Sequence, residues 1–268
     1  MVRLNPNNIF LNFSFLCFIM KTIVIKLGGS VLTEKKDYKK ANKKMISQLA
    51  REISKINNKY KIILVHGAGS FGHAPVVKYK INNGIKTKKH KLGFADTHLS
   101  VSQLSNMIVE ALIFHGVSAV SLTPTLLFKQ NNKKVCSFND KIVKDFLDAG
   151  YLPILYGDMV LDKKLNGSVL SGDQIMKLVS KKMKADKMVF ISDVEGVYVD
   201  GKVFPKITKS NLSSIKSHLG GSAKVDVTGG MYGKLMEIMK SKVSSVITNP
   251  QNLAKAVQGK KVGTSILP

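Results

Sequence analysis

The sequence predicts an α/β protein, a three-layer α/β/α sandwich with an open, mostly parallel sheet and helices on both faces. Short β-branched apolar runs alternate with segments of helical spacing along nearly the whole chain, which is typical of parallel sheets with crossover helices. Glycine clusters directly follow several of these runs, as in folds that bind ligands at the carboxyl ends of strands. The chain has 268 residues, 44% of them hydrophobic, which suffices for one large domain or two lobes.

The first strand is predicted at 22–26, where β-branched residues precede a pair of glycines. A helix follows at 41–56, because its apolar residues share one face at helical spacing. The second strand, 62–65, is wholly apolar and therefore buried, and a helix is expected to begin near Ser70. The segment 82–93 is polar and basic, which indicates a loop.

The middle of the chain is predicted to continue the alternation of helices and strands. A long helix is expected at 96–114 with Asp96 as its N-cap, followed by a strand at 117–122. Turn residues at 130–133 and at Asn166-Gly167 indicate two hairpins. The other elements expected here are a helix at 140–149, a strand at 152–156, a helix at 172–183 and a strand at 187–192.

The C-terminal part begins with a loop at 196–204, which is expected because the segment contains glycine and aspartate. Gly229 and Gly230 precede a further segment of helical spacing. The elements predicted after the loop are a short helix at 211–218, a helix at 231–242, a strand at 243–248, a helix at 251–257 and a last strand at 263–267.

The net charge of +25 favours a nucleic-acid partner, but the arrangement of the basic residues argues against one. Arg3 and Arg51 are the only arginines, the lysines are spread along the whole chain, and there is no tryptophan. No basic run is interleaved with aromatic residues that could stack on bases. We therefore interpret the lysines as solvated faces and expect no nucleic-acid partner.

The N-terminal segment 1–19 is interpreted as an extension or a mis-assigned start, because Met20 directly precedes the first strand. The apolar stretch 10–20 is too short to span a bilayer, and no small-residue cleavage site follows it. The alternative is a short membrane-surface anchor, but we expect no membrane partner. The cysteines, Cys17 and Cys136, are isolated, which fits a reducing, cytoplasmic location without a disulfide framework or a metal site.

The segment 61–73, KIILVHGAGSFGH, predicts a phosphate site. Its buried strand runs into three glycines within six residues, and glycine lets backbone N–H groups approach a ligand closely. A helix that begins near Ser70 would add a partial positive charge at the same place. Two histidines, His66 and His73, flank the turn. The alternative, a glycine-rich connection without a ligand, stays open at this point.

Charged residues gather at the predicted strand ends. Lys26 ends the first strand, Asp173 follows the second hairpin, and Asp193 follows a later strand. Lys234 lies one turn into the helix that 228–230 opens. Backbone donors, lysines and aspartates are the parts that phosphoryl transfer requires. No pair of nucleophile and base is evident, and neither the Walker sequence nor the protein-kinase motifs occur.

Five motifs in this order resemble the amino acid kinase superfamily, over almost everything from Met20 to Pro268. They are KLGGS at 26–30, the glycine turn at 67–69, GD at 172–173, SDVEGVY at 192–198 and TGGMYGK at 228–234. The form HGAGSFGH at 66–73, with a histidine that ends the turn, is similar to the isopentenyl phosphate kinases. Members that resemble fosfomycin kinases share a related histidine, whereas acetylglutamate kinases, aspartokinases and UMP kinases lack this pattern.

The resemblance implies the roles of individual residues. Lys26 and Lys234 would hold the ATP phosphates and stabilise the transferred phosphoryl group, with Asp173 orienting both and Lys35 as an accessory stabiliser. His73 would bind the phosphate of the acceptor, which Ala68 and Gly172 would also touch. The residues implied for ATP are Lys26, Leu27, Gly28, Gly29, Ser30, Gly69, Asp193, Tyr198, Val199, Asp200, Gly201, Lys202, Val203, Gly230 and Lys234.

Structural roles remain open alternatives for two of these candidates and are considered for the other histidines. Lys35 has a lysine beside it and could be a solvated residue, and Asp193 could cap a turn. His66 is interpreted as structural. The histidines interpreted as ordinary surface or cap residues are His90, His98, His115 and His218.

The resemblance also implies the reaction, in which ATP with Mg²⁺ phosphorylates isopentenyl phosphate to isopentenyl diphosphate in the alternative mevalonate route of isoprenoid biosynthesis. The lobe at 20–170 would bind the acceptor and the lobe at 171–268 would bind ATP, in a homodimer. No protein ligand to the metal is implied. The alternatives are a fosfomycin-type phosphonate kinase and a non-catalytic nucleotide-binding relative. The joint presence of Lys26, Asp173 and Lys234 argues against lost catalysis.

Overall fold

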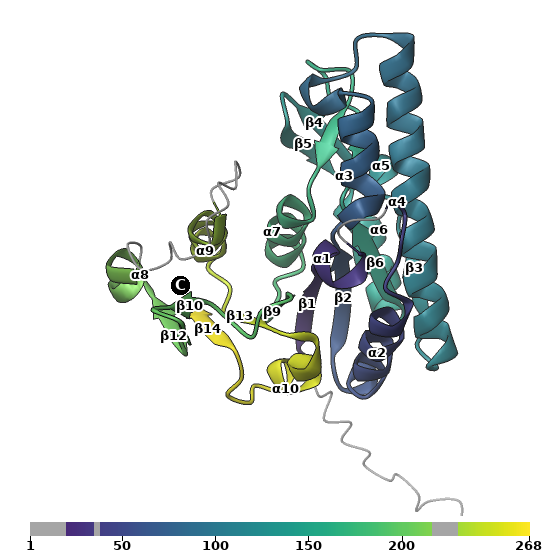
Figure 1. Ribbon diagram of the computed structural model, residues 1–268. Helices are drawn as coiled ribbons and strands as arrows, with labels where there is room; N and C mark the ends of the chain where they lie inside the picture. The colour runs from purple at the N-terminus through teal and green to yellow at the C-terminus, as the bar shows by residue number, and fades with distance from the viewer. Residues whose placement is uncertain (1–19, 35–37, 216–229) are drawn as a thin grey trace, which may run out of the picture.

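A computed structural model describes residues 20–34, 38–215 and 230–268. These residues form an eight-stranded sheet with helices on both faces (Figure 1). All pairings within this sheet are parallel except the one between β13 and β14, so the predicted α/β fold class is confirmed. The strand order is β12 (Lys206–Thr208), β14 (Thr264–Leu267), β13 (Ser245–Thr248), β9 (Lys187–Ile191), β1 (Thr22–Leu27), β2 (Lys61–His66), β6 (Leu152–Tyr156) and β3 (Ala119–Ser121).

Helices and three separate hairpins complete the described part of the chain. The hairpins are β4 (Phe128–Asn131) with β5 (Lys134–Phe138), β7 (Asp158–Val160) with β8 (Ser168–Leu170), and β10 (Tyr198–Val199) with β11 (Lys202–Val203). The α-helices are α1 (Gly29–Leu32), α2 (Lys43–Ser54), α3 (Gly69–Lys78), α4 (Lys88–Phe114), α5 (Pro124–Leu127), α6 (Asp140–Asp148), α7 (Gly172–Lys182), α8 (Lys209–Ile215), α9 (Gly230–Ser241) and α10 (Leu253–Val257), and short 3₁₀ turns lie at Asn57–Lys59, Ile81–Asn83 and Pro250–Asn252.

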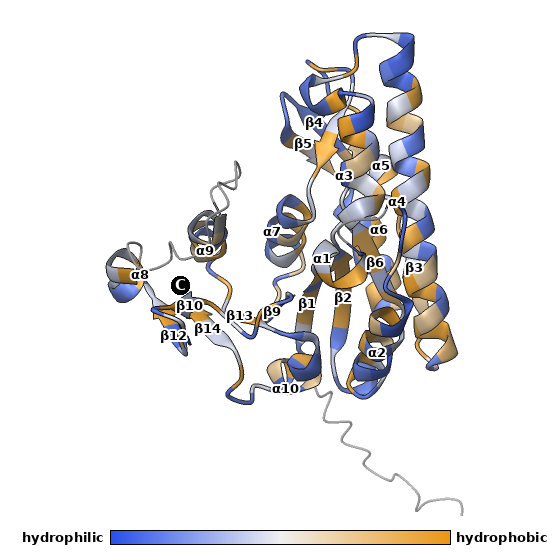
Figure 2. Cartoon of the chain, in the orientation of Figure 1, coloured by the Kyte–Doolittle hydropathy of each residue, from blue (hydrophilic) through white to orange (hydrophobic). Residues whose placement is uncertain are grey.

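Alternation along the strands builds a hydrophobic core on each face of the sheet. On β1, Ile23 and Ile25 point into the core beneath α2 and α4, whereas Val24 points into the core beneath α7 and α9. All three side chains are essentially unexposed. Hydrophobic residues accordingly concentrate on the strands, while the surrounding helices carry both apolar and polar residues (Figure 2). Burial on both faces explains why the strands read as continuous apolar runs.

A third and smaller cluster lies apart from the sheet, where α3 and α4 pack on the β7–β8 hairpin. Its buried members are Val76, Ile81, Ile85 and Met159, and the partly buried Tyr79 and Phe94 pack against it. This cluster lies beyond the glycine turn that precedes α3 and is the small hydrophobic core of that end of the molecule.

The predicted start of the long helix was wrong. Asp96 was expected as the N-cap after a loop at 82–93, but α4 begins at Lys88 and Thr87 accepts a hydrogen bond from the His90 amide at 3.2 Å. Gly93, which read as a loop residue, permits close packing between helices. A Cβ at this position would lie 2.5 Å from Cβ of Tyr79, the C-cap residue of α3.

The prediction of a plain loop at 196–204 was also wrong, because this segment contains the hairpin β10–β11. Its turn residues Asp200 and Gly201 have φ values of 48° and 76°, which suit a tight two-residue hairpin turn. The edge strand β12 was not predicted either, since a three-residue strand carries almost no periodicity. Residues 1–19, on which the extension was predicted, lie outside the described residues.

Candidate active site

The two glycine turns lie at the same edge of the sheet because β1, β2 and β9 run parallel and in register. Leu27 pairs with His66 on one side and with Ile191 on the other. Backbone hydrogen bonds continue this register past the strand ends, since the Gly28 amide donates to the Ile191 carbonyl and the Gly67 amide to the Leu27 carbonyl, both at 2.9 Å. The carboxyl ends of three strands therefore deliver their following residues to one place.

The two turns pack directly on each other, and only glycine fits there. A Cβ on Gly29 would lie 2.5 Å from the amide nitrogen of Gly69, and a Cβ on Gly67 would lie 2.7 Å from that of Gly29. Gly69 has a φ of +51°, which disfavours any L side chain. Thr33 links the turns, because its Oγ1 donates to the Gly29 carbonyl and accepts from the Ser70 amide, both at 3.0 Å.

A third turn, between β6 and β7, joins this pair of glycine turns. A Cβ on Gly157 would lie 3.3 Å from the amide nitrogen of Gly172 and 3.9 Å from that of Ala68. A Cβ on Gly172 would in turn lie 3.4 Å from Cε of Lys26. The helices α3 and α7 begin at Gly69 and Gly172, so the positive ends of two helix dipoles meet here. The arrangement is suited to hold an anion.

Lys26 is the buried cation of this site, and its side chain is only 12% exposed. Its Nζ donates a hydrogen bond to Oδ1 of Asp173, the second residue of α7. Burial lowers the pKa of Lys26 below the usual value of lysine; the attraction of Asp173 opposes this, and the nearby charge of Lys234 adds to it. The structure thus brings Lys26, Asp173 and Lys234 together from three distant parts of the chain.

The local sequence explains why α7 begins where it does. Ser171 and Gln174 form a capping box, in which the Ser171 hydroxyl accepts from the Gln174 amide and the Gln174 side chain accepts from the Ser171 amide. Asp173 lies in the first turn, where a carboxylate is favourable to the helix dipole. The cap therefore holds the carboxylate toward Lys26.

The residues predicted for the nucleotide follow β9 at the same edge. Asp193 comes two residues after the end of that strand and accepts a hydrogen bond from the Ser192 hydroxyl at 3.2 Å. The segment 198–203 forms the hairpin β10–β11, whose base is attached to β14 because the Val197 amide donates to Thr264 Oγ1 at 2.8 Å. Tyr198 is 43% exposed on this hairpin.

The histidines of the second glycine turn differ sharply in environment. His73 lies on α3 one helical turn after Gly69, and its side chain is exposed. His66 is completely buried and stacks on Tyr156 with ring centroids 5.1 Å apart. Burial lowers the pKa of His66 to about 4, so the ring is neutral near neutral pH. Its Nδ1 contacts the Gly67 carbonyl at 3.0 Å, which agrees with its interpretation as a structural residue.

Some predicted residues lie outside the described part of the chain, and two residues of this region were not predicted from the sequence as candidates for the site. Lys35 and the glycine turn at 228–229 lie outside the described residues, while Gly230 begins α9. Gly157-Asp158 was interpreted as a plain turn, and His98 as an ordinary surface residue. Asp158 comes two residues after the end of β6, as Asp193 does after β9, and this position was the signal in the sequence that could have identified it.

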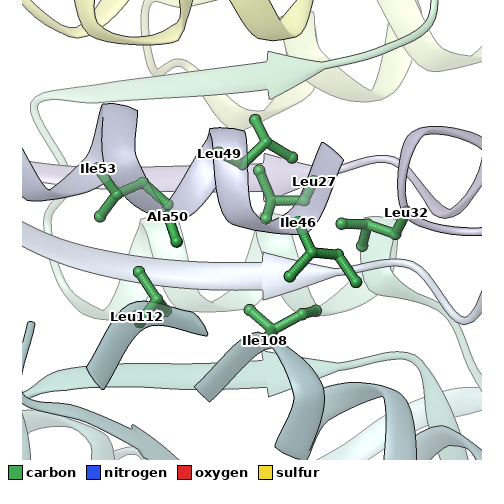
Figure 3. Close-up of a pocket in the computed structure, with 8 residues that line it drawn as sticks. All are labelled: Leu27, Leu32, Ile46, Leu49, Ala50, Ile53, Ile108 and Leu112. Carbon is green, nitrogen blue, oxygen red and sulfur yellow. The ribbon is translucent and has the colours of Figure 1, made fainter. Parts of the chain in front are cut away.

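An apolar hollow elsewhere in the fold is core packing rather than a ligand site. It lies between α2, α4 and the end of β1 and has no room for a water molecule (Figure 3). The side chains that line it are all apolar: Leu27, Leu32, Ile46, Leu49, Ala50, Ile53, Ile108 and Leu112. A phosphate would find no polar partner there. Among the helices that the structure describes, none is long and apolar enough to cross a membrane.

Comparison with known families gives a match over most of the chain. The profile of the amino acid kinase family matches residues 21–249. The chain belongs to the amino acid kinase family. The resemblance inferred from the five motifs is therefore confirmed.

Individual relatives within the family are isopentenyl phosphate kinases. The protein of that name from Methanocaldococcus jannaschii is 33% identical over 91% of this chain and 97% of its own length. The one from Methanothermobacter thermautotrophicus is also 33% identical, over 91% of this chain and 98% of its own length. A crystal structure of an isopentenyl phosphate kinase superposes with a TM-score of 0.78 at 28% identity, covering 91% of this chain and all of the other.

Proposed function

We propose that this chain transfers the γ-phosphate of ATP to isopentenyl phosphate and so forms isopentenyl diphosphate and ADP. The observation that carries the proposal is the buried Lys26, paired with Asp173 and close to Lys234, at the point where the glycine turns meet. The similarity to isopentenyl phosphate kinases over nine-tenths of the chain supports the choice of acceptor.

The chemistry follows from the charges. The acceptor already carries a phosphate, so its oxygen can attack the γ-phosphate without a strong base, but two anionic groups must be brought together. Lys26 and Lys234 offset this repulsion and stabilise the charge of the phosphoryl group in flight. Asp173 orients Lys26. In our proposal His73 donates to the acceptor phosphate, beside Ala68 and Gly172, and Lys35 adds a further positive charge.

The nucleotide is proposed to lie against the first glycine turn and the elements that follow β9. Gly28, Gly29 and Ser30 would face its phosphates, and Asp193 with the hairpin 198–203 would hold the base and ribose. The lobes would then be 20–170 for the acceptor and 171–268 for ATP. In the described part of the chain no group of three His, Cys, Asp or Glu side chains could hold a metal. We propose that Mg²⁺ is held by ATP oxygens and water, where it would neutralise phosphate charge.

A direct assay tests the reaction. ADP release is measured with isopentenyl phosphate, fosfomycin and several amino acids as acceptors, and the product is identified by ³¹P NMR. We expect rapid turnover with isopentenyl phosphate and formation of a diphosphate. Turnover of fosfomycin alone would replace our proposal with the phosphonate-kinase alternative, and no turnover of any acceptor would support a non-catalytic relative. The homodimer and the cytoplasmic location stay predictions.

Substitution of His73 tests the acceptor assignment. His73→Ala should impair turnover of isopentenyl phosphate by about 10²-fold or more with nearly unchanged ATP affinity, because a charge-assisted hydrogen bond to the acceptor is lost. His73→Gln, which keeps a neutral donor, should recover part of the activity. His90→Ala on α4 is the matched control and should behave like wild type. Normal kinetics of a stable His73→Ala protein would contradict this role.

A further inference from the structure

A buried carboxylate holds a second histidine at the end of the molecule where we expect the acceptor. The Asp158 side chain is completely unexposed, whereas the side chain of His98 on α4 is 33% exposed. His98 Nδ1 lies 2.9 Å from Oδ2 and 3.2 Å from Oδ1 of Asp158. Thr125 Oγ1 lies 2.8 Å from Oδ2 and 2.5 Å from the Met159 carbonyl oxygen, and the Met159 amide donates to Oδ1 at 2.8 Å. Thr125 and the Met159 amide thus hold the Asp158 carboxylate, which in turn orients the imidazole of His98.

The orientation of the His98 ring leaves its other nitrogen available. Because Nδ1 faces an unexposed carboxylate, the exposed part of the ring is its opposite edge, which carries Nε2. Among the described residues no side chain or backbone group makes a hydrogen bond to His98 Nε2. The hydrogen bond with Asp158 raises the pKa of His98 above its usual value, although partial burial opposes this. His98 is therefore held through its Nδ1, and its Nε2 can donate a hydrogen bond to a ligand when the ring is protonated.

The position of Asp158 relates this pair to the phosphate site. Asp158 directly follows Gly157, at which a Cβ would lie within 3.9 Å of the amide nitrogens of both Gly172 and Ala68. These two residues are the ones that we expect to touch the acceptor. An anionic side chain so close to an anionic substrate would repel it unless a cation lay between them.

The packing of α3 against α4 brings His98 to the level of His73. The two helices run antiparallel, because a Cβ on Gly72 would lie 3.2 Å from Val101 and a Cβ on Gly93 would lie 2.5 Å from Tyr79. His73 is one residue beyond Gly72 along α3, and His98 is three residues before Val101 along α4. At 1.5 Å per residue the two histidines differ by only about 3 Å along the helix axes. Figure 1 shows both helices side by side.

We propose that His98 is a second histidine of the acceptor site, which donates from Nε2 to an oxygen of the phosphate of the bound acceptor while Asp158 acts as its positioning residue. This inference rests on the proposed function and adds a contact to it. It also explains why a buried carboxylate is tolerated beside a site for anions, since the hydrogen bond with His98 offsets its charge.

Kinetics of four variants test the proposal. His98→Ala should raise KM for isopentenyl phosphate by about 10–100-fold with little change in KM for ATP, the range expected for a lost hydrogen bond to a charged group. His98→Gln should recover part of the loss. The double variant His98→Ala with Asp158→Asn should bind the acceptor better than His98→Ala alone, because the stranded carboxylate is gone. His115→Ala, at the far end of α4, is the control and should leave both KM values unchanged.

The outcomes separate this inference from the proposed function. If wild type turns over isopentenyl phosphate and folded His98→Ala has an unchanged KM for it, only the role of His98 is overturned. Equal increases of both KM values, or a double variant no better than His98→Ala, would show that the pair only supports the fold. If His98→Ala does not fold, an unchanged KM of His98→Gln overturns the proposal. A wild type that neither turns over nor binds isopentenyl phosphate in calorimetry overturns both.

Discussion

Replacing Lys26 with methionine should separate catalysis from stability. Methionine has a similar length but no charge, so it removes the cation from the site without leaving a large cavity. Lys26 has a side chain that is 12% exposed, and desolvation outweighs the attraction of Asp173, so the protonated lysine is held at a net cost to folding. Its partner Asp173 is 53% exposed and can be solvated by water when it loses the lysine.

The substitution should lower kcat without lowering the free energy of unfolding. Loss of a cation that stabilises the transferred phosphoryl group should lower kcat by about 10²–10³-fold, which corresponds to roughly 2.7–4 kcal/mol. The free energy of unfolding should stay constant or rise by about 1 kcal/mol, the low end of the gain seen when a buried charge is replaced by an apolar side chain. A gain of that size would raise Tm by roughly 2–4 °C in a protein of this size.

The assay combines steady-state kinetics at saturating ATP with thermal and urea unfolding of the same preparations. Lys177→Met on α7 is the matched control, because Lys177 is also paired with a carboxylate, that of Glu237, but lies on the surface. This control should retain wild-type kcat. A Lys26→Met protein whose kcat falls by less than tenfold would refute the catalytic argument, and a fall in Tm of more than about 5 °C would refute the account of its burial.

Three further predictions concern the glycine turn and the acceptor end. The pKa of buried His66 is lowered to about 4, so between pH 6.5 and 4 the unfolded state binds a proton that the folded state does not. The free energy of unfolding should therefore fall by about 3 kcal/mol as the pH drops through this window. Urea unfolding of His66→Phe should show a smaller loss of stability over the same pH range, and an equal loss would contradict the role of His66. Gly69→Ala should lose roughly 1–3 kcal/mol and most activity, because φ is +51° and its Cβ would meet Thr33, whereas Gly116→Ala, which also has a positive φ but has free space around it and follows α4, should retain full activity. Phe94→Ala should open the small apolar cluster and admit longer prenyl phosphates, measured as relative kcat/KM, while Leu99→Ala, 56% exposed, should not; an unchanged chain-length preference in Phe94→Ala would count against this wall.

The order of strands, glycine turns and helices followed from the sequence because each of these features is local. A β-branched run such as 22–26 and the glycines after it predict a strand and its end within ten residues. The family motifs are equally local, which is why Lys26, Asp173 and Lys234 could be selected from the sequence alone. Where local signals compete, the sequence was misleading. Asp96 looked like an N-cap, but Thr87 caps α4, and Gly93 lies inside the helix where it packs against Tyr79.

Only the tertiary structure decided which of these local features meet. The order β9-β1-β2-β6 makes neighbours of strands that are far apart in the chain, and Lys26 reaches Asp173 across 147 residues. The same order brings Gly157 against Gly172 and Ala68, and the tertiary fold pairs Asp158 with His98, which the sequence suggested to be a turn residue and a surface residue. Periodicity reports which face of an element is buried. It carries no information on which other element covers that face, because that choice is made by packing among all the elements at once.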